Sequence, residues 1–122
     1  MIENRIEQKE ALKSLLEFNA GVVKNMTIIV KELSGERMDD TDTFLAEIIK
    51  ALNWEIQVVN GTMDLLNEGK VRIEKGYFNE KVVALSDAVA EKDDAKMAEA
   101  FTELIPMFEV LGKAAEKVIV LN

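Results

Sequence analysis

The chain has 122 residues, a formal net charge of −8, and neither histidine nor cysteine. This length suits one domain with a sizeable core, residues 1–122, and the missing cysteine excludes disulfides and thiolate metal sites. The missing histidine removes the commonest general base, metal ligand and pH switch, and the acidic balance disfavours nucleic acids and anionic membrane surfaces.

The sequence shows no signal for a membrane or an export pathway. Its longest apolar runs fall far short of the roughly 20 residues that a membrane span requires. Met1 leads into a charged segment and not into a basic-then-apolar leader, so we expect a cytoplasmic protein. One proline and six glycines leave few breaks, and no sustained alternation typical of strands is present. The chain is therefore predicted to be almost entirely helical.

The first helix is predicted to run from about Ile2 to Leu33. Its apolar residues recur at alternating steps of four and three, the pattern of a seam buried against partner helices. These residues are Leu12, Leu16, Val23, Met26, Val30 and Leu33. Asn19 takes the remaining seam position, where it could fix the helix register or bond to a neighbouring backbone group. Ser34 and Gly35 are expected to end the helix.

The second helix, centred on residues 44–66, has two apolar rows. The main seam consists of Leu45, Ile49, Leu52, Ile56, Val59, Met63 and Leu66. The second row repeats every seven residues through Phe44, Ala51, Val58 and Leu65, with Trp54 beside it. Asp39, Asp40 or Thr41 is expected to cap this helix, because the nearby carboxylates lack the glycine and glutamate offsets of a calcium loop.

The third helix is predicted over Asn79–Glu91, with a start anywhere from Val71 onwards. Lys92, Asp93 and Asp94 form a break in which an aspartate caps the fourth helix. The fourth seam consists of Met97, Phe101, Leu104, Phe108, Leu111, Ala115 and Val118. Pro106 lies on the outward side of this helix and is expected to bend it without breaking it. Four such helices with short links predict an all-α, antiparallel up-down four-helix bundle with long helices.

No catalytic, cofactor-binding or metal-binding residues are assigned. Di-iron bundles need inward Glu-x-x-His pairs, which a chain without histidine cannot form. All-helical nucleotide pyrophosphatases bind magnesium through paired acidic motifs, for which the nearest candidates are Glu47 with Glu55 and Glu99 with Glu103. These glutamates lie mostly away from the seams and are interpreted as surface charges. We therefore expect no enzyme activity and no cofactor; the alternative is a divalent-metal-dependent hydrolase that uses surface carboxylates.

Trp54 allows two interpretations. It lies about 200° around the helix from Leu52, so it cannot share the main seam. Either it fills a gap against the first or third helix, or it belongs to an exposed apolar strip. The strip, our candidate interface, consists of Ala51, Trp54, Val58 and Gly61. Because exposed apolar strips mark interfaces and symmetric dimers are the commonest oligomers, the second interpretation predicts a homodimer.

Two segments of the chain, residues 45–60 and 85–111, resemble a group of small uncharacterised bacterial helical proteins. The resemblance covers about the C-terminal two-thirds and is carried by Leu45, Glu47, Ile48, Ile49, Leu52, Trp54, Ala88, Asp93, Glu103 and Pro106. This group has no assigned activity, so the resemblance implies no catalytic residues. The length and acidic helical architecture also look like those of flagellar export chaperones, by analogy of fold alone.

The predicted function is that of a non-enzymatic protein-interaction module, an adaptor or small chaperone. Apolar helix faces would hold an amphipathic helix of a partner protein. The alternatives are the metal-dependent hydrolase and a purely structural homodimer.

Overall fold

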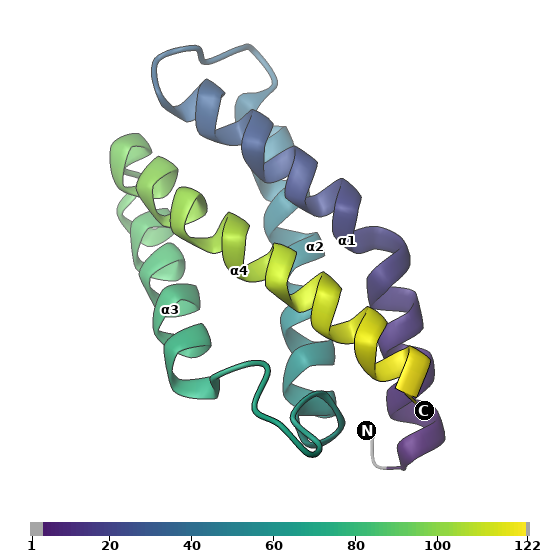
Figure 1. Ribbon diagram of the computed structural model, residues 1–122. Helices are drawn as coiled ribbons and strands as arrows, with labels where there is room; N and C mark the ends of the chain where they lie inside the picture. Colours follow the sequence, from purple (N-terminus) through teal and green to yellow (C-terminus); the bar gives the residue numbers. More distant parts are fainter. Residues whose placement is uncertain (1–3, 122) are drawn as a thin grey trace.

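The computed structural model describes residues 4–121, which form four helices: α1 (Arg5–Leu33), α2 (Thr41–Leu66), α3 (Lys75–Glu91) and α4 (Asp94–Leu121). The helices run alternately in opposite directions, with the α1–α2 connection at one end and the α2–α3 connection at the other (Figure 1). No strand occurs between residues 4 and 121. The predicted all-α four-helix bundle is confirmed.

The helix ends agree closely with the sequence signals. The predicted start of the first helix at Ile2 lies outside the described residues, and its predicted end at Leu33 is confirmed. α3 begins inside the predicted window because the side chain of Glu74 accepts hydrogen bonds from the backbone N–H groups of Gly76 and Tyr77. At the next break, the Asp93 side chain accepts from the Lys96 backbone N–H at 3.1 Å, which confirms an aspartate cap for α4.

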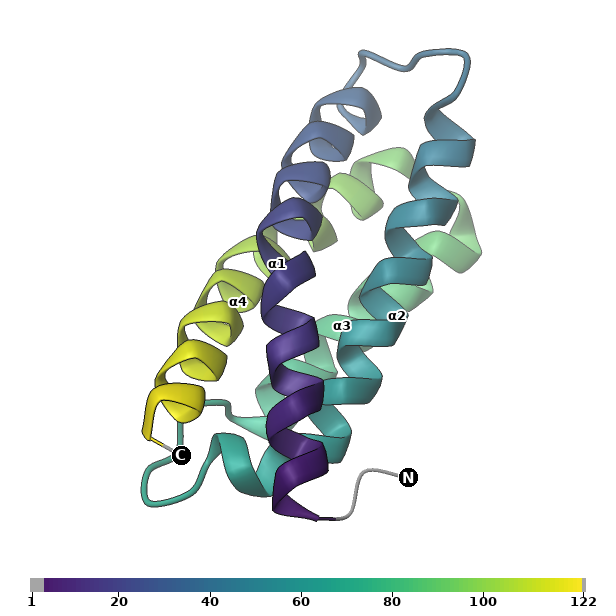
Figure 2. The ribbon, with the colours of Figure 1, turned by 90° about the vertical axis from the view of Figure 1, so that its right-hand side faces the viewer.

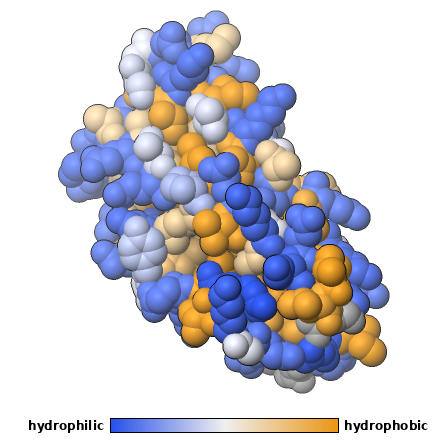
Figure 3. Space-filling view, in the orientation of Figure 1, coloured by the Kyte–Doolittle hydropathy of each residue, from blue (hydrophilic) through white to orange (hydrophobic). Residues whose placement is uncertain are grey.

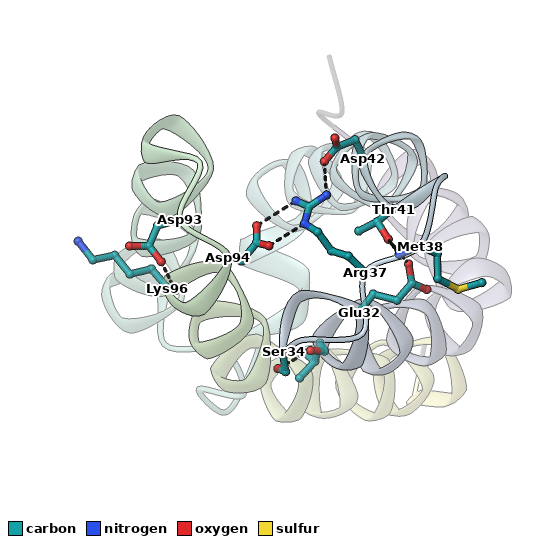
Figure 4. Close-up of polar contacts among 10 residues, drawn as sticks. Glu32, Ser34, Arg37, Met38, Thr41, Asp42, Asp93, Asp94 and Lys96 are labelled. Atoms are coloured by element: carbon teal, nitrogen blue, oxygen red, sulfur yellow. Dashed lines mark hydrogen bonds and ion pairs between the residues drawn. The ribbon is translucent and has the colours of Figure 1, made fainter.

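α2 begins at the predicted place, but without the expected capping hydrogen bond from a side chain. Asp40 occupies the N-cap position, but its side chain makes no capping hydrogen bond. Thr41 instead accepts from the Met38 backbone N–H at 2.7 Å and donates to the buried Glu32 carboxylate at 2.8 Å (Figure 4). One acidic residue of this segment has another role, because Asp42 accepts a hydrogen bond from Arg37, which also donates to Asp94. This arginine links the α1–α2 connection to the first residues of α2 and α4.

The helices are not packed equally against one another. α1 makes its most extensive contact with α4 and its next with α2, while α3 packs on α4. Figure 2 shows α1 between α4 and α2, with α3 behind them. The backbones of α2 and α3 approach each other at no more than an isolated point. The helices therefore follow the order α2–α1–α4–α3, and the side between α2 and α3 is the open side of the bundle.

The seam predicted for α4 is correct, since all seven of its residues are buried. In α1 and α2, alternate seam positions are wrong by one residue. The buried residues include Leu15, Val22 and Ile29 in α1, and Ile48, Glu55 and Thr62 in α2. The predicted members Leu16, Val23, Val30, Ile49, Ile56 and Met63 are only half-buried. For α2 the reason is the open side, because this helix packs chiefly against α1 and has little contact with α3.

Pro106 does not interrupt α4, which continues as one helix from Asp94 to Leu121. The proline is exposed, as predicted from its outward position. Its exposed position places the lost backbone hydrogen bond on the outward side of the helix.

Candidate functional site

A groove of about 570 Å³ lies between α1 and α2. We call it the aromatic groove, and its wall is mainly apolar. It is lined by Phe18, Gly21, Val22 and Asn25 from α1 and by Glu47, Lys50, Ala51, Trp54 and Glu55 from α2.

Two exposed aromatic rings, one from each helix, line this groove. Phe18 and Trp54 meet edge to face with their ring centroids 5.9 Å apart. Phe18 is 59% exposed and Trp54 is 39% exposed. An edge-to-face pair contributes only about 0.5–1.5 kcal/mol beyond the area that it buries. With more than half of its surface exposed, Phe18 remains available for another contact.

The four candidate interface residues do not form one surface strip. Ala51 and Trp54 line the aromatic groove. Val58 is only 4% exposed and belongs to the core, because this row of α2 turns toward α1. Gly61 is half-buried and lies outside the groove lining. Our strip was therefore wrong at Val58, whereas the interface role of Ala51 and Trp54 stays a prediction.

Sequence reasoning missed Phe18. The sequence signal for Phe18 was its position directly before the seam residue Asn19, beside the buried face of α1. A phenylalanine there marks a wider apolar face, but only the register between α1 and α2 shows that its ring meets Trp54.

Glu55, at the inner wall of the groove, is fully buried. Its Oε1 accepts a hydrogen bond from Asn19 Nδ2 at 3.0 Å, and the same nitrogen donates to the Phe108 backbone carbonyl at 3.1 Å. Oε2 of Glu55 has no hydrogen-bond partner within residues 4–121. Our interpretation of Glu55 as a surface charge is wrong, because α2 turns this position toward α1.

Asn19 connects three helices at one level of the bundle. It reaches Glu55 on α2 and the backbone of Phe108 on α4, so the predicted bond to a neighbouring backbone group is confirmed. The role of Asn19 in fixing the helix register stays a prediction. The close approach depends on Gly112, where a Cβ atom would lie 2.4 Å from Asn19 Oδ1. Only a residue without a side chain leaves room for this contact.

Burial strongly affects the ionisation of Glu55. Removal from water disfavours the charged carboxylate and raises the pKa of Glu55 to about 7, against the opposing effect of the Asn19 hydrogen bond. Near neutral pH the buried carboxyl group is therefore divided between its neutral and ionised forms.

The other candidate carboxylates lie at the surface, where Glu99 and Glu103 line one hollow between α3 and α4 together with Asp87 and Glu91. Glu47 and Glu99 are exposed, and Glu103 forms an ion pair with Lys81 at 3.3 Å. Within the described part of the chain, no group of three or more acidic side chains is arranged to hold a metal ion.

A second hollow, of about 390 Å³, lies between α3 and α4. Its exposed aromatic ring is Tyr77, with Lys81 Nζ 5.4 Å from the ring centroid. Figure 3, in the orientation of Figure 1, shows hydrophobic residues in patches among hydrophilic ones. This hollow has neither an exposed aromatic pair nor an unsatisfied buried carboxylate among its lining residues. The aromatic groove is therefore the stronger candidate.

Comparison with known families assigns the chain to one family. A family model described as a domain of unknown function, DUF8042, matches residues 10–114. The chain belongs to this family. The resemblance to an uncharacterised helical family is confirmed, and the DUF8042 match includes Phe18, Asn19, Trp54, Glu55 and Gly112.

The remaining comparisons add no function. No curated protein and no solved structure is significantly similar to the chain. As for membranes, none of the helices within residues 4–121 has the length and hydropathy needed to span a bilayer.

Proposed function

We propose that this DUF8042 chain is a non-enzymatic module, an adaptor or small chaperone in the cytoplasm, that binds a partner protein through the aromatic groove. The observation that carries the proposal is the exposed Phe18–Trp54 pair on the wall of an apolar groove. Large aromatic side chains are enriched among the residues that dominate binding energy at interfaces. Surface apolar grooves between helices also commonly hold the apolar face of a partner helix.

The charge of the chain defines the partner further. With a net charge of −8, the bundle attracts basic segments and repels acidic ones. An amphipathic helix with basic flanks combines the apolar anchors that suit the groove with the charge that speeds encounter. Binding should therefore weaken modestly as the salt concentration rises.

Three variants test this proposal. Trp54→Lys and Phe18→Glu change the groove, whereas Tyr77→Lys changes an aromatic side chain that is similarly exposed on α3. Cross-linking in native cells identifies candidate partners, and binding is then measured with the purified partner. We expect each groove variant to weaken binding at least about tenfold, the size of a hot-spot loss, and Tyr77→Lys to leave it unchanged.

Circular dichroism and light scattering control this experiment. All variants should keep the helical spectrum, because the substituted side chains are exposed. Recovery of self-dimers alone, which the Trp54→Lys variant converts to folded monomers, would replace the proposal with the structural homodimer. Equal partner binding by the groove variants and the wild type would exclude the groove as the interface.

A further inference from the structure

The inner wall of the aromatic groove contains a carboxylate that the bundle leaves only partly satisfied. Glu55 is fully buried, and one of its oxygens has no hydrogen-bond partner in the described residues. Its pairings there include no ion pair with a lysine or arginine. Fully buried glutamates are rare unless a cation or a complete set of hydrogen bonds compensates for the lost water. In its ionised form, the Glu55 carboxylate therefore has room for one more donor, which residues 4–121 do not supply.

We propose that the aromatic groove receives a lysine side chain of the partner protein, whose ammonium group binds Oε2 of Glu55. This inference rests on the proposed function and names the side chain that the groove recognises. The methylene stem of lysine suits the apolar wall formed by Phe18, Ala51 and Trp54, and its charged end suits the carboxylate. The two exposed rings also attract a cation that passes over their faces.

The geometry of Glu55 favours lysine over arginine. Asn19 Nδ2 already donates to Oε1, so Oε2 is the oxygen without a hydrogen bond. A guanidinium group binds a carboxylate best through both oxygens at once, whereas an ammonium group is a compact charge that needs one. A single open oxygen therefore matches an ammonium group.

The aromatic groove also has room for a lysine side chain. A Cβ atom at Gly21 would have no neighbour within 4 Å, so space is open on the α1 side. Since Glu55 is fully buried, the ligand reaches it only after side chains of the groove shift. Phe18 is 59% exposed and can change rotamer rapidly, and such changes are common when interfaces form. The carboxylate has already lost its water in the free bundle, so binding does not incur that desolvation cost again.

A purely structural role for Glu55 makes a different prediction. If the carboxylate serves only to hold Asn19 in register, then its charge contributes nothing to ligand binding. A lysine mimic and an uncharged molecule of the same length would then bind equally well. This difference can be measured without knowing the partner.

The test uses n-pentylammonium chloride as the probe and n-pentanol as its uncharged counterpart. Trp54 is the only tryptophan, so its fluorescence reports on the groove directly. We expect saturable binding of the ammonium probe to the wild-type chain, about tenfold tighter than binding of the alcohol, as for a hydrogen bond to a charged group. Glu55→Gln should abolish this preference. Glu47→Gln removes one exposed charge from the same groove and should retain it.

Three results would overturn the inference: equal binding of the two probes, no saturable binding, or equal losses in the Glu47→Gln and Glu55→Gln variants. Tighter binding of an n-pentylguanidinium probe would overturn the assignment to lysine. If Glu55→Gln does not fold, the carboxyl carbon resonance of Glu55 in the wild-type chain provides the readout. It should move with the ammonium probe and stay in place with the alcohol.

The same variants separate this inference from the proposed function. If the Trp54→Lys variant no longer binds the partner but the Glu55→Gln variant binds it as well as the wild type does, the lysine site is excluded and the protein-binding role is retained. If the chain captures no partner but binds the ammonium probe in a way that depends on Glu55, the ammonium site is retained and the protein-binding role is excluded.

Discussion

All four helices have apolar residues at similar spacing, yet they pack differently. α1 and α4 are in extensive contact, whereas α2 and α3 leave an open side. α1 and α4 lie close because α4 places Gly112 against Asn19, and small residues such as Ala114 and Ala115 are buried nearby along α4. Between α2 and α3, half-buried side chains line a cavity of about 160 Å³. They include Ile49, Ile56, Val82 and Val89. Apolar spacing thus predicts that a helix has a buried face, but residue size decides how closely a neighbour approaches.

Core truncation should reveal the largest difference between these two regions. Phe108→Ala removes a fully buried ring beside the Asn19 contact and should lower the free energy of unfolding by ~3–5 kcal/mol. Ile56→Ala on the open side removes a half-buried side chain and should lower it by roughly 1–2 kcal/mol, since the site is already partly solvated. Urea denaturation of both variants gives the comparison. Equal losses would show that the open side is packed as tightly as the closed one.

The free energy of unfolding should depend on pH through Glu55, at the polar contact between α1 and α2. The pKa of Glu55 is raised from 4.5 to about 7 by folding, so the folded chain holds a proton that the unfolded chain has released between these values. The resulting stability is complete below pH 4.5 and is lost as the pH rises to about 7. The loss should amount to about 3 kcal/mol at most.

Glu55→Gln isolates this contribution, because glutamine has the same shape and no charge. We expect the variant to melt at a higher temperature than the wild type at pH 8 and at a similar temperature at pH 5. Thermal unfolding followed by circular dichroism at both pH values provides the measurement. A variant that is less stable at pH 8 would show that the ionised carboxylate stabilises the bundle.

A pair of glycine variants tests the close approach of α1 and α4 with a smaller expected effect. Gly112→Ala forces its new Cβ atom against Asn19 and should cost ~1–3 kcal/mol, as overpacking in a core does. Gly21→Ala meets open space and should stabilise the helix by up to ~1 kcal/mol. Chemical denaturation distinguishes the two signs. Stabilisation by both substitutions would mean that Asn19 moves aside freely and that the contact with Gly112 is loose.

The sequence was sufficient to predict the four helices and the complete buried seam of one of them, α4. Regular apolar spacing located α4 and the seven residues of its seam, all of them buried, and glycine and aspartate signals marked helix ends. These features depend on neighbouring residues along the chain, so they need no knowledge of the other helices.

The candidate site could be predicted only in part, because it depends on how α1 and α2 face each other. Asn19 was identified as a seam residue, and Trp54 was identified as lying outside the main seam. Glu55 was missed because a charged side chain is normally a solvated one. The available signal was its seven-residue spacing from Ile48 and Thr62, which become buried with it once α2 turns toward α1. Its pairing with Asn19, 36 residues away, required the register between the helices.

The pairing of α1 with α4 also has a consequence for the order of folding. The hydrogen bond from Asn19 to the Phe108 carbonyl joins residues 89 positions apart, whereas the α1–α2 and α3–α4 hairpins join near neighbours in the chain. Contacts between distant segments form more slowly, because a long loop must close first. During synthesis, α1 and α2 therefore leave the ribosome before α1 can meet its main neighbour. The hairpins can form early, but α1 gains its largest contact only after α4 has been made.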